Sequence, residues 1–129
     1  MSVANTPAPQ PQGSIAIQTI AMPADANWQG DIFGGWLMSQ MDLAGAVHAR
    51  QLAKGRVATI AVEQMTFLKP VPVGSLVSCY TRLLKKGRSS LTVLIEVWIA
   101  HEQAEAAKVT EGTFVYVAID DEGHKRLLP

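Results

Sequence analysis

The chain of 129 residues contains a single cysteine, Cys79, and three histidines that are far apart in the sequence. A single cysteine excludes an intrachain disulfide, and its apolar, strand-like surroundings indicate a buried, unreactive thiol. The scattered histidines exclude the Cys and His spacings that are typical of a zinc site. We therefore expect neither a metal nor a redox cofactor.

The charge of the chain is also unbiased, with 11 Lys and Arg against 11 Asp and Glu. This excludes the large cationic surface of a protein that binds nucleic acid or an anionic membrane. No apolar run reaches the roughly 20 residues of a membrane span, and no signal peptide is visible. We expect a cytoplasmic protein without nucleic-acid or membrane partners. Its 48% hydrophobic content with only 17% charged residues indicates apolar surface buried between subunits.

Composition divides the chain into a tail and one domain. Residues 1–13 hold three of the seven prolines and no large apolar side chain beyond the initiator, which predicts a disordered N-terminal tail. Residues 14–129 are expected to form a single domain that opens with a strand at 14–21. After a loop, the pattern is helical from Gly34 or Gly35 to Ala53. Four further strands are expected at residues 56–68, 75–85, 89–102 and 107–120.

The order of these elements, one strand, one long helix and four strands, predicts an α+β fold with the helix lying on one antiparallel sheet. The helix should be near 27 Å long at about 1.5 Å per residue, enough to cross a small sheet. In the third of the later strands, alternation predicts one shared face for Leu91, Val93, Ile95, Val97 and Ile99. The short connections between successive strands favour antiparallel pairing of neighbours.

One carboxylate, Asp42, lies on the apolar side of the predicted helix. Its neighbours on the helical wheel are all apolar or small: Met38, Met41, Gly45, Ala46 and Ala49. A buried acid without a partner is costly, so the position needs a reason. Asp42 is either a structural carboxylate, held by backbone N–H groups or by a polar partner across an interface, or a catalytic acid or base.

The start of the same helix carries Gly34 and Gly35, which leave the first backbone N–H groups unobstructed. Free N–H groups at a helix start can stabilise the oxyanion of a carbonyl under attack. Asp42 lies seven residues beyond Gly35, about 10 Å along the axis. One carbonyl cannot contact both groups of one helix, so a site that uses both must be shared between two subunits.

From Ser14 to Pro129 the sequence resembles the YciA-type bacterial acyl-CoA thioesterases, which have the hot-dog fold. The densest resemblance lies in AMPADANWQGDIFGGWLMSQMDLAGA, GRVATIAVEQMTFLKPVPVG and KKGRSS. It implies one long central helix wrapped by a five-stranded antiparallel sheet. It also implies homodimers that assemble further, often as trimers of dimers, and acyl-CoA as the substrate, with coenzyme A present only as part of substrate and product.

The resemblance assigns Asp42 as the catalytic carboxylate, acting with Gly34 and Gly35 of the partner subunit. Family members often carry an asparagine at the position of Gln29, so the accompanying polar residues are assigned here to Asn27 and Asp31. A clamp for the phosphates of CoA is assigned to the KKGRSS turn and a cation near the C-terminal end, because Arg offers a bidentate fork and Ser a neutral donor. The members of this clamp are Lys86, Gly87, Arg88, Ser89, Ser90 and Arg126.

Two other functions remain open from the sequence. A hot-dog hydratase or dehydratase would need a histidine positioned with an acid beside the thioester, and His48 points away from Asp42 on the wheel. A non-enzymatic acyl-CoA-binding module would keep the basic turn and would not need Asp42. For the thioesterase, Asp42 acts either as a general base on water or as a nucleophile that forms an anhydride.

Overall fold

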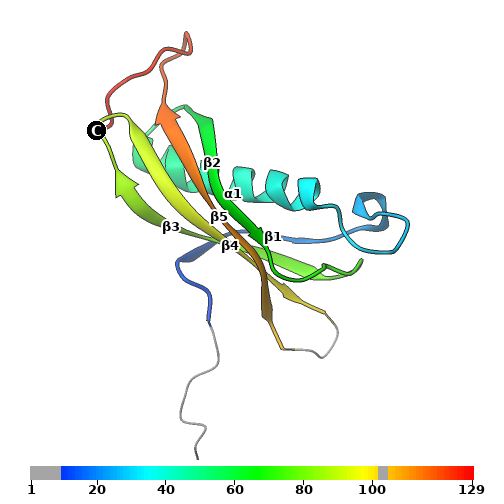
Figure 1. Ribbon diagram of the computed structural model, residues 1–129. Helices are drawn as coiled ribbons and strands as arrows, with labels where there is room; N and C mark the ends of the chain where they lie inside the picture. Colours follow the sequence, from blue (N-terminus) through cyan, green and yellow to red (C-terminus); the bar gives the residue numbers. More distant parts are fainter. Residues whose placement is uncertain (1–9, 102–104) are drawn as a thin grey trace, which may run out of the picture.

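The computed structural model describes residues 10–101 and 105–129. The elements are β1 (Ser14–Ile20), a short 3-10 helix (Pro23–Asp25), α1 (Gly34–Ala53), β2 (Val57–Phe67), β3 (Leu76–Lys86), β4 (Ser90–Ala100) and β5 (Ala107–Ala118). Figure 1 shows α1 lying along one face of the strands. The helix and all five strands are therefore confirmed, with ends within two residues of those predicted.

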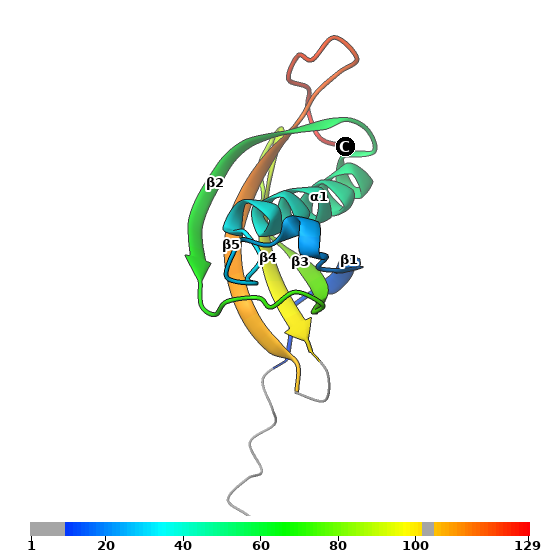
Figure 2. The ribbon, with the colours of Figure 1, turned by 90° about the vertical axis from the view of Figure 1, so that its right-hand side faces the viewer.

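The five strands form one antiparallel sheet in the order β1-β3-β4-β5-β2. Figure 2 shows the sheet curving around α1, which lies on its concave side. This arrangement confirms the predicted α+β architecture, a hot-dog fold with one long helix wrapped by a five-stranded sheet.

One expectation about pairing is wrong: β2 and β3 do not pair, although a short connection joins them. β2 pairs with β5 instead, and β3 lies between β1 and β4. The connection contains Pro70 and Pro72, which have no N–H to donate to a hairpin, and Pro72 forms an isolated bridge with Asp31. Among the described residues, β2 therefore ends the sheet with one edge unpaired.

The core lies between α1 and the concave face of the sheet. Four of the residues predicted to share one face of β4 are fully buried, and Ile99 is half-buried at the end of the row. Burial of each such side chain stabilises the fold by roughly 1.5–3 kcal/mol. The buried positions of the helix are Leu37, Met41, Ala44, Gly45, Ala49 and Ala53. Four of these six are alanine or glycine, so the helix backbone can approach the sheet closely.

The two ends of α1 are built differently. At the start, the cap residue Phe33 offers no side-chain hydrogen bond to the first turn. At the end, Lys54 takes the left-handed conformation with φ 54°, and Gly55 serves close packing: a Cβ on Gly55 would lie 2.7 Å from Nη2 of Arg126. None of the helical segments in the described part of the chain combines the length and hydropathy that a bilayer crossing requires.

The outer face of the sheet holds a buried carboxylate, Glu96, which is 2% exposed. Its Oε1 accepts hydrogen bonds from Nε1 of Trp98 at 2.8 Å and from the N–H of Gln12 at 3.3 Å, and its Oε2 lies 3.9 Å from Nζ of Lys108. These bonds join residues leading into β1 to the outside of β4. Of the predicted N-terminal tail, residues 1–9 lie outside the described residues.

The glycine in the middle of α1 gives a stability prediction. Helix propensity alone favours Gly45→Ala by about 1 kcal/mol. The added Cβ, however, would lie 2.1 Å from Oη of Tyr116 and 2.8 Å from Cδ1 of Ile95, and such overpacking costs typically about 1–3 kcal/mol. We expect Gly45→Ala to lower the midpoint of thermal unfolding. Gly35→Ala is the matched control, since its Cβ would meet nothing within 4 Å. A midpoint that rises in Gly45→Ala would contradict the close packing.

Candidate active site

Asp42 is half-buried on α1, and two hydroxyl groups of the sheet hold one of its carboxylate oxygens. Oγ1 of Thr59 donates to Oδ1 of Asp42 at 2.6 Å, and Oη of Tyr116 lies 3.2 Å from the same oxygen. Within the described residues, Oδ2 has no hydrogen-bond partner. The carboxylate is thus held by its own chain through one oxygen, which leaves the other oxygen able to react.

The two hydroxyl groups come from neighbouring strands. Thr59 of β2 and Tyr116 of β5 are directly opposite each other in the antiparallel register. Burial raises the pKa of the Tyr116 phenol well above its ordinary value, and the charge and hydrogen bond of Asp42 raise it further. Tyr116 therefore stays protonated and acts as a donor at every pH where the protein would be assayed.

The start of α1 leaves two backbone donors free. The N–H of Phe33 donates to the carbonyl of Asp25, and the N–H of Trp36 donates to the carbonyl of Phe33. The N–H groups of Gly34 and Gly35 lie between them, and no acceptor is found for either in the described part of the chain. These two N–H groups can therefore donate hydrogen bonds to an anionic oxygen of a ligand.

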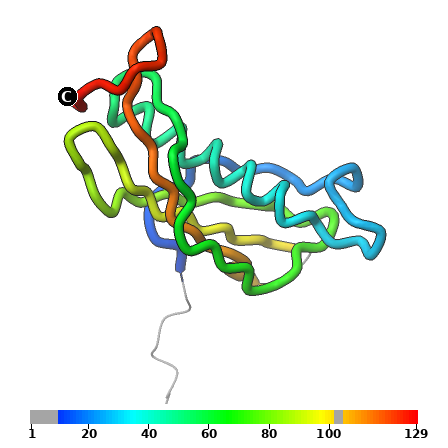
Figure 3. The backbone as a smooth tube through the Cα atoms, turned by 45° about the horizontal axis from the view of Figure 1, so that its top comes forward, coloured from blue at the N-terminus to red at the C-terminus, as the bar shows by residue number. Residues whose placement is uncertain are grey.

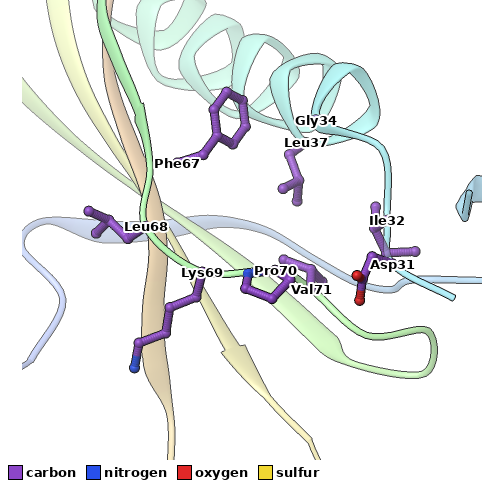
Figure 4. Close-up of a pocket in the computed structure, with 9 residues that line it drawn as sticks. All are labelled: Asp31, Ile32, Gly34, Leu37, Phe67, Leu68, Lys69, Pro70 and Val71. Atoms are coloured by element: carbon purple, nitrogen blue, oxygen red, sulfur yellow. The ribbon is translucent and has the colours of Figure 1, made fainter. Parts of the chain in front are cut away.

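A recess of about 340 Å³ opens beside this helix start. Figure 4 shows the ring of Phe67 facing the first turn of α1, with Pro70 and Val71 below, while the side chain of Lys69 extends away from the helix. The lining of the recess is mostly apolar and consists of Asp31, Ile32, Gly34, Leu37, Phe67, Leu68, Lys69, Pro70 and Val71. The recess suits an apolar group whose polar end reaches the free N–H groups.

Asn27 and Asp31 organise the loop that leads into α1. Oδ1 of Asn27 accepts from the N–H groups of Gln29 at 2.9 Å and Asp31 at 3.1 Å, and the N–H of Asn27 donates to the carbonyl of Asp31 at 2.7 Å. The carboxamide oxygen of Asn27 is thus occupied by the loop. Asp31 is half-buried and lines the recess beside Gly34.

A single chain does not bring all of the predicted catalytic residues together. Gly34, Gly35 and Asp31 meet at the first turn of the helix, and Asp42 lies on the same helix about 10 Å further along. Asp42 does not line the recess. The carboxylate and the two free N–H groups therefore lie at two separate places within one chain.

The predicted phosphate clamp lies near the far end of the helix. A recess of about 280 Å³ is lined there by Arg88, Ser89, Lys125, Arg126 and Leu127. Figure 3 shows the C-terminal segment, in red, beside the turn between β3 and β4, and the N–H of Leu128 donates to the carbonyl of Arg88 at 2.9 Å. The structure thus brings the turn and the C-terminal cations together.

Some residues of the predicted clamp already form hydrogen bonds within the protein, and others do not. Nζ of Lys86 donates to the carbonyl of Pro129 at 2.8 Å, and the N–H of Gly87 donates to the carbonyl of Ser90 at 2.8 Å, which closes the turn. Arg126 donates from Nε to Ile119 and from Nη2 to Ala53, so it joins the helix end to the C-terminal segment. Arg88 is exposed, and its guanidinium has no protein partner in the described residues.

Two other residues, and the question of a metal site, bear on the possible chemistry. Nδ1 of His48 lies 3.0 Å from Oγ1 of Thr81, on β3, away from Asp42. Cys79 is buried, and desolvation raises the pKa of its thiol to about 12, so it is not a nucleophile. No three His, Cys, Asp or Glu side chains lie close enough to hold a metal ion, in the residues that the structure describes.

Thr59 and Tyr116 are the site residues that sequence reasoning missed. They lie 17 and 74 residues beyond Asp42, on strands whose pairing with each other was not predicted. The only sequence signal was indirect: Gly45 stands on the face of Asp42, and a glycine within a helix can mark a close approach of another group.

The comparisons with known proteins concern the family and the fold. A family model described as the thioesterase superfamily matches residues 29–106. The acyl-CoA thioester hydrolase YciA of Escherichia coli (strain K12) is 54% identical over 123 residues, which cover 92% of this chain and 93% of that protein. The crystal structure of a hexameric thioesterase from Yersinia pestis matches with a TM-score of 0.90 and 54% identity, covering 93% of this chain and 98% of that one.

A more distant relative has been solved with single residues substituted. An acyl-CoA hydrolase from Staphylococcus aureus, solved with butyryl coenzyme A and coenzyme A, matches with a TM-score of 0.81 and 27% identity, covering 88% of this chain and 70% of that one. Three single variants of that hydrolase have also been solved, in which alanine replaces an asparagine, a threonine or an aspartate. The aspartate follows the asparagine by 15 residues and precedes the threonine by 17.

Proposed function

This chain belongs to the thioesterase superfamily and hydrolyses acyl-CoA thioesters to a free acid and CoA, and we propose that Asp42 is the carboxylate that carries out the reaction. The observation that carries this proposal is the half-buried Asp42, with Oδ1 held by two hydroxyl groups and Oδ2 free. The spacings of the Staphylococcus aureus variants support it, because Asn27, Asp42 and Thr59 are also 15 and 17 residues apart.

Two routes are chemically open to Oδ2. As a general base it takes a proton from water, whose oxygen bonds to the thioester carbon while the C–S bond breaks and the CoA sulfur leaves with that proton. As a nucleophile it bonds to the thioester carbon itself, the CoA thiolate leaves, and water then hydrolyses the mixed anhydride. In either route the carbonyl oxygen gains negative charge, and neither route requires a metal or a redox cofactor.

We propose that the oxyanion binds to the free N–H groups of Gly34 and Gly35 of the partner subunit. The helix dipole favours negative charge at this position, and backbone donors fixed in a dry site need no reorganisation during the reaction. The recess beside this helix start would accommodate the first part of the acyl chain. Asp31 and Asn27 hold the loop that positions these donors.

The same subunit pairing accounts for the exposed apolar surface near Asp42. The open edge of β2 exposes Ile60 and Val62, and the outer face of α1 exposes Leu43 and Val47. A second copy that pairs along β2 would continue the sheet and cover these side chains. It would also cover the edge that carries Thr59, the partner of Asp42. A trimer of such dimers would account for a hexamer like that of the Yersinia pestis relative.

The phosphates of CoA are proposed to bind Arg88 with Ser89 and Lys125, in the recess at the β3–β4 turn. Arg88 has an unoccupied guanidinium and can form a bidentate pair with a phosphate. Arg126 lines the same recess, but its side chain donates to the carbonyls of Ala53 and Ile119. We therefore assign it a structural role in the wall of the recess.

The first test of the function replaces the carboxylate. We expect Asp42→Ala and Asp42→Asn to lower kcat for acyl-CoA hydrolysis by about 10² or more, the scale of a positioned acid–base group. CoA release is measured with a thiol reagent over a panel of acyl-CoAs, and the one cysteine is buried, so it contributes little background. Asp121→Asn, at an exposed carboxylate, is the control.

Three outcomes separate the possible functions. Near-wild-type turnover in either Asp42 variant contradicts the role of Asp42. Substrate binding without any release of CoA by the wild type would identify a binding module. Addition of water to an enoyl-CoA without cleavage of the thioester would identify a hydratase.

The second test concerns the phosphate clamp. Arg88→Ala should raise KM for acyl-CoA about 10-fold, the loss of one hydrogen-bonded charge pair, and leave kcat little changed. Hydrolysis of a short pantetheine thioester, which lacks the nucleotide phosphates, should be unaffected. Arg82→Ala, at an exposed arginine of β3, is the control. Equal losses on both substrates would instead indicate a structural role for Arg88 in the turn.

The third test asks whether two subunits build each site. Asp42→Ala lacks the carboxylate, and Gly35→Pro removes one free N–H at a position with open space around it. Each variant is first shown to be folded and inactive alone. After co-refolding at equal ratio, half of the dimers should be mixed, each with one intact site, so about a quarter of wild-type activity should return. A mixture that stays inactive while mass measurements confirm subunit exchange would rule out the shared site.

A further inference from the structure

We propose that Tyr116 is a positioning residue for the reaction: its buried hydroxyl holds Oδ1 of Asp42 so that Oδ2 faces the thioester, and Gly45 leaves the space that the hydroxyl needs. This inference rests on the proposed function, because it gives Tyr116 a role only through Asp42.

The position of the Tyr116 hydroxyl is strongly constrained. Tyr116 is fully buried on β5 under α1, and its ring stacks on Phe114 with ring centroids 6.4 Å apart and planes 17° from parallel. A fully buried, close-packed ring is held in its rotamer by its neighbours. Its Oη therefore marks a fixed point, 3.2 Å from Oδ1 and 2.9 Å from the backbone carbonyl oxygen of Asp42.

The single proton of this hydroxyl has two acceptors on the same residue. The carbonyl oxygen of Asp42 lies 2.9 Å from the hydroxyl and Oδ1 lies 3.2 Å from it, so both are within hydrogen-bond distance of the one proton. The phenol stays protonated because its pKa is raised by burial first and by Asp42 second. When Asp42 loses its charge by taking a proton or an acyl group, the hydroxyl can turn to the carbonyl without leaving its place. Tyr116 thus has an acceptor on Asp42 at either oxygen.

Gly45 makes this contact possible. It lies three residues after Asp42, on the same side of the helix, and faces the tyrosine directly. A Cβ at Gly45 would lie 2.1 Å from Oη and 2.7 Å from Cζ of Tyr116. Any other residue would push the ring away from Asp42. The glycine is therefore explained by the hydroxyl beneath it.

Thr59 and Tyr116 hold the same oxygen from different sides. Thr59 is exposed at the open edge of the sheet, and Tyr116 is enclosed below the helix. In the proposed dimer the second copy also covers Thr59, so both hydroxyl groups then lie away from water. Tyr116 differs from Thr59 because its position is set within one chain, by burial under α1 and by the stacked ring of Phe114.

The experiment uses Tyr116→Phe in the full chain, with steady-state kinetics on the acyl-CoA that the wild type hydrolyses fastest. We expect kcat to fall about 10-fold, the value of one hydrogen bond to a charged group, while KM stays within about twofold. In the Asp42→Ala background the same substitution should leave the residual rate unchanged, because Tyr116 acts only through Asp42. Tyr80→Phe, the one other tyrosine, is the control.

The outcomes separate this inference from the proposed function. Full activity of Asp42→Ala would overturn the proposed role of Asp42, on which this inference rests. An inactive Asp42→Ala together with a wild-type kcat in Tyr116→Phe would overturn only the positioning role, as would an equal loss in both backgrounds.

A second measurement leaves Tyr116 in place and so does not depend on the folding of Tyr116→Phe. With tyrosine labelled at ¹³Cζ, the two tyrosines give two NMR signals. Replacing Asp42 by alanine should shift the Tyr116 signal and leave that of Tyr80 where it was. An unchanged pair of signals would show that the hydroxyl does not contact the carboxylate.

Discussion

A carboxylate on the apolar face of a helix has to be hydrogen-bonded, and the structure around Asp42 depends on this constraint. Two hydroxyl groups meet Oδ1, one from β2 and one from β5, because these strands are paired with Thr59 opposite Tyr116. The helix must lie close enough for both to reach, which requires a small residue at Gly45. Strand order, register and helix composition thus serve one contact.

The helix carries the two groups of the candidate site at separate positions. Its first turn offers free N–H groups beside an apolar recess, and its middle offers the carboxylate, about 10 Å away. A thioester carbonyl is much smaller than this distance. The proposed pairing of two chains through the open edge of β2 would resolve the mismatch, since each helix start could then serve the carboxylate of the other chain. The exposed apolar side chains of β2 and α1 are consistent with this pairing.

Charge is used sparingly and locally. The chain has no net charge, and yet Arg88, Lys125 and Arg126 line one recess next to the end of the helix. Arg126 is held by backbone carbonyls, whereas the guanidinium of Arg88 has no hydrogen-bond partner among the described residues. On the outer face, Glu96 is buried with Trp98 and Lys108 and holds the residues that lead into β1. A local cluster can bind phosphate without making the whole surface attractive to other polyanions.

The sequence by itself determined the elements, the fold class, and Asp42 as the residue in need of a reason, because periodicity and helical spacing are local properties. The tertiary structure alone decided that β2 pairs with β5 rather than β3. Pro70 and Pro72 disfavour a hairpin between β2 and β3, but they do not specify which strand β2 pairs with instead. The tertiary structure also decided the partners of Asp42. Thr59 and Tyr116 are distant in sequence, and their meeting at one oxygen depends on strand order and register, which no local pattern encodes.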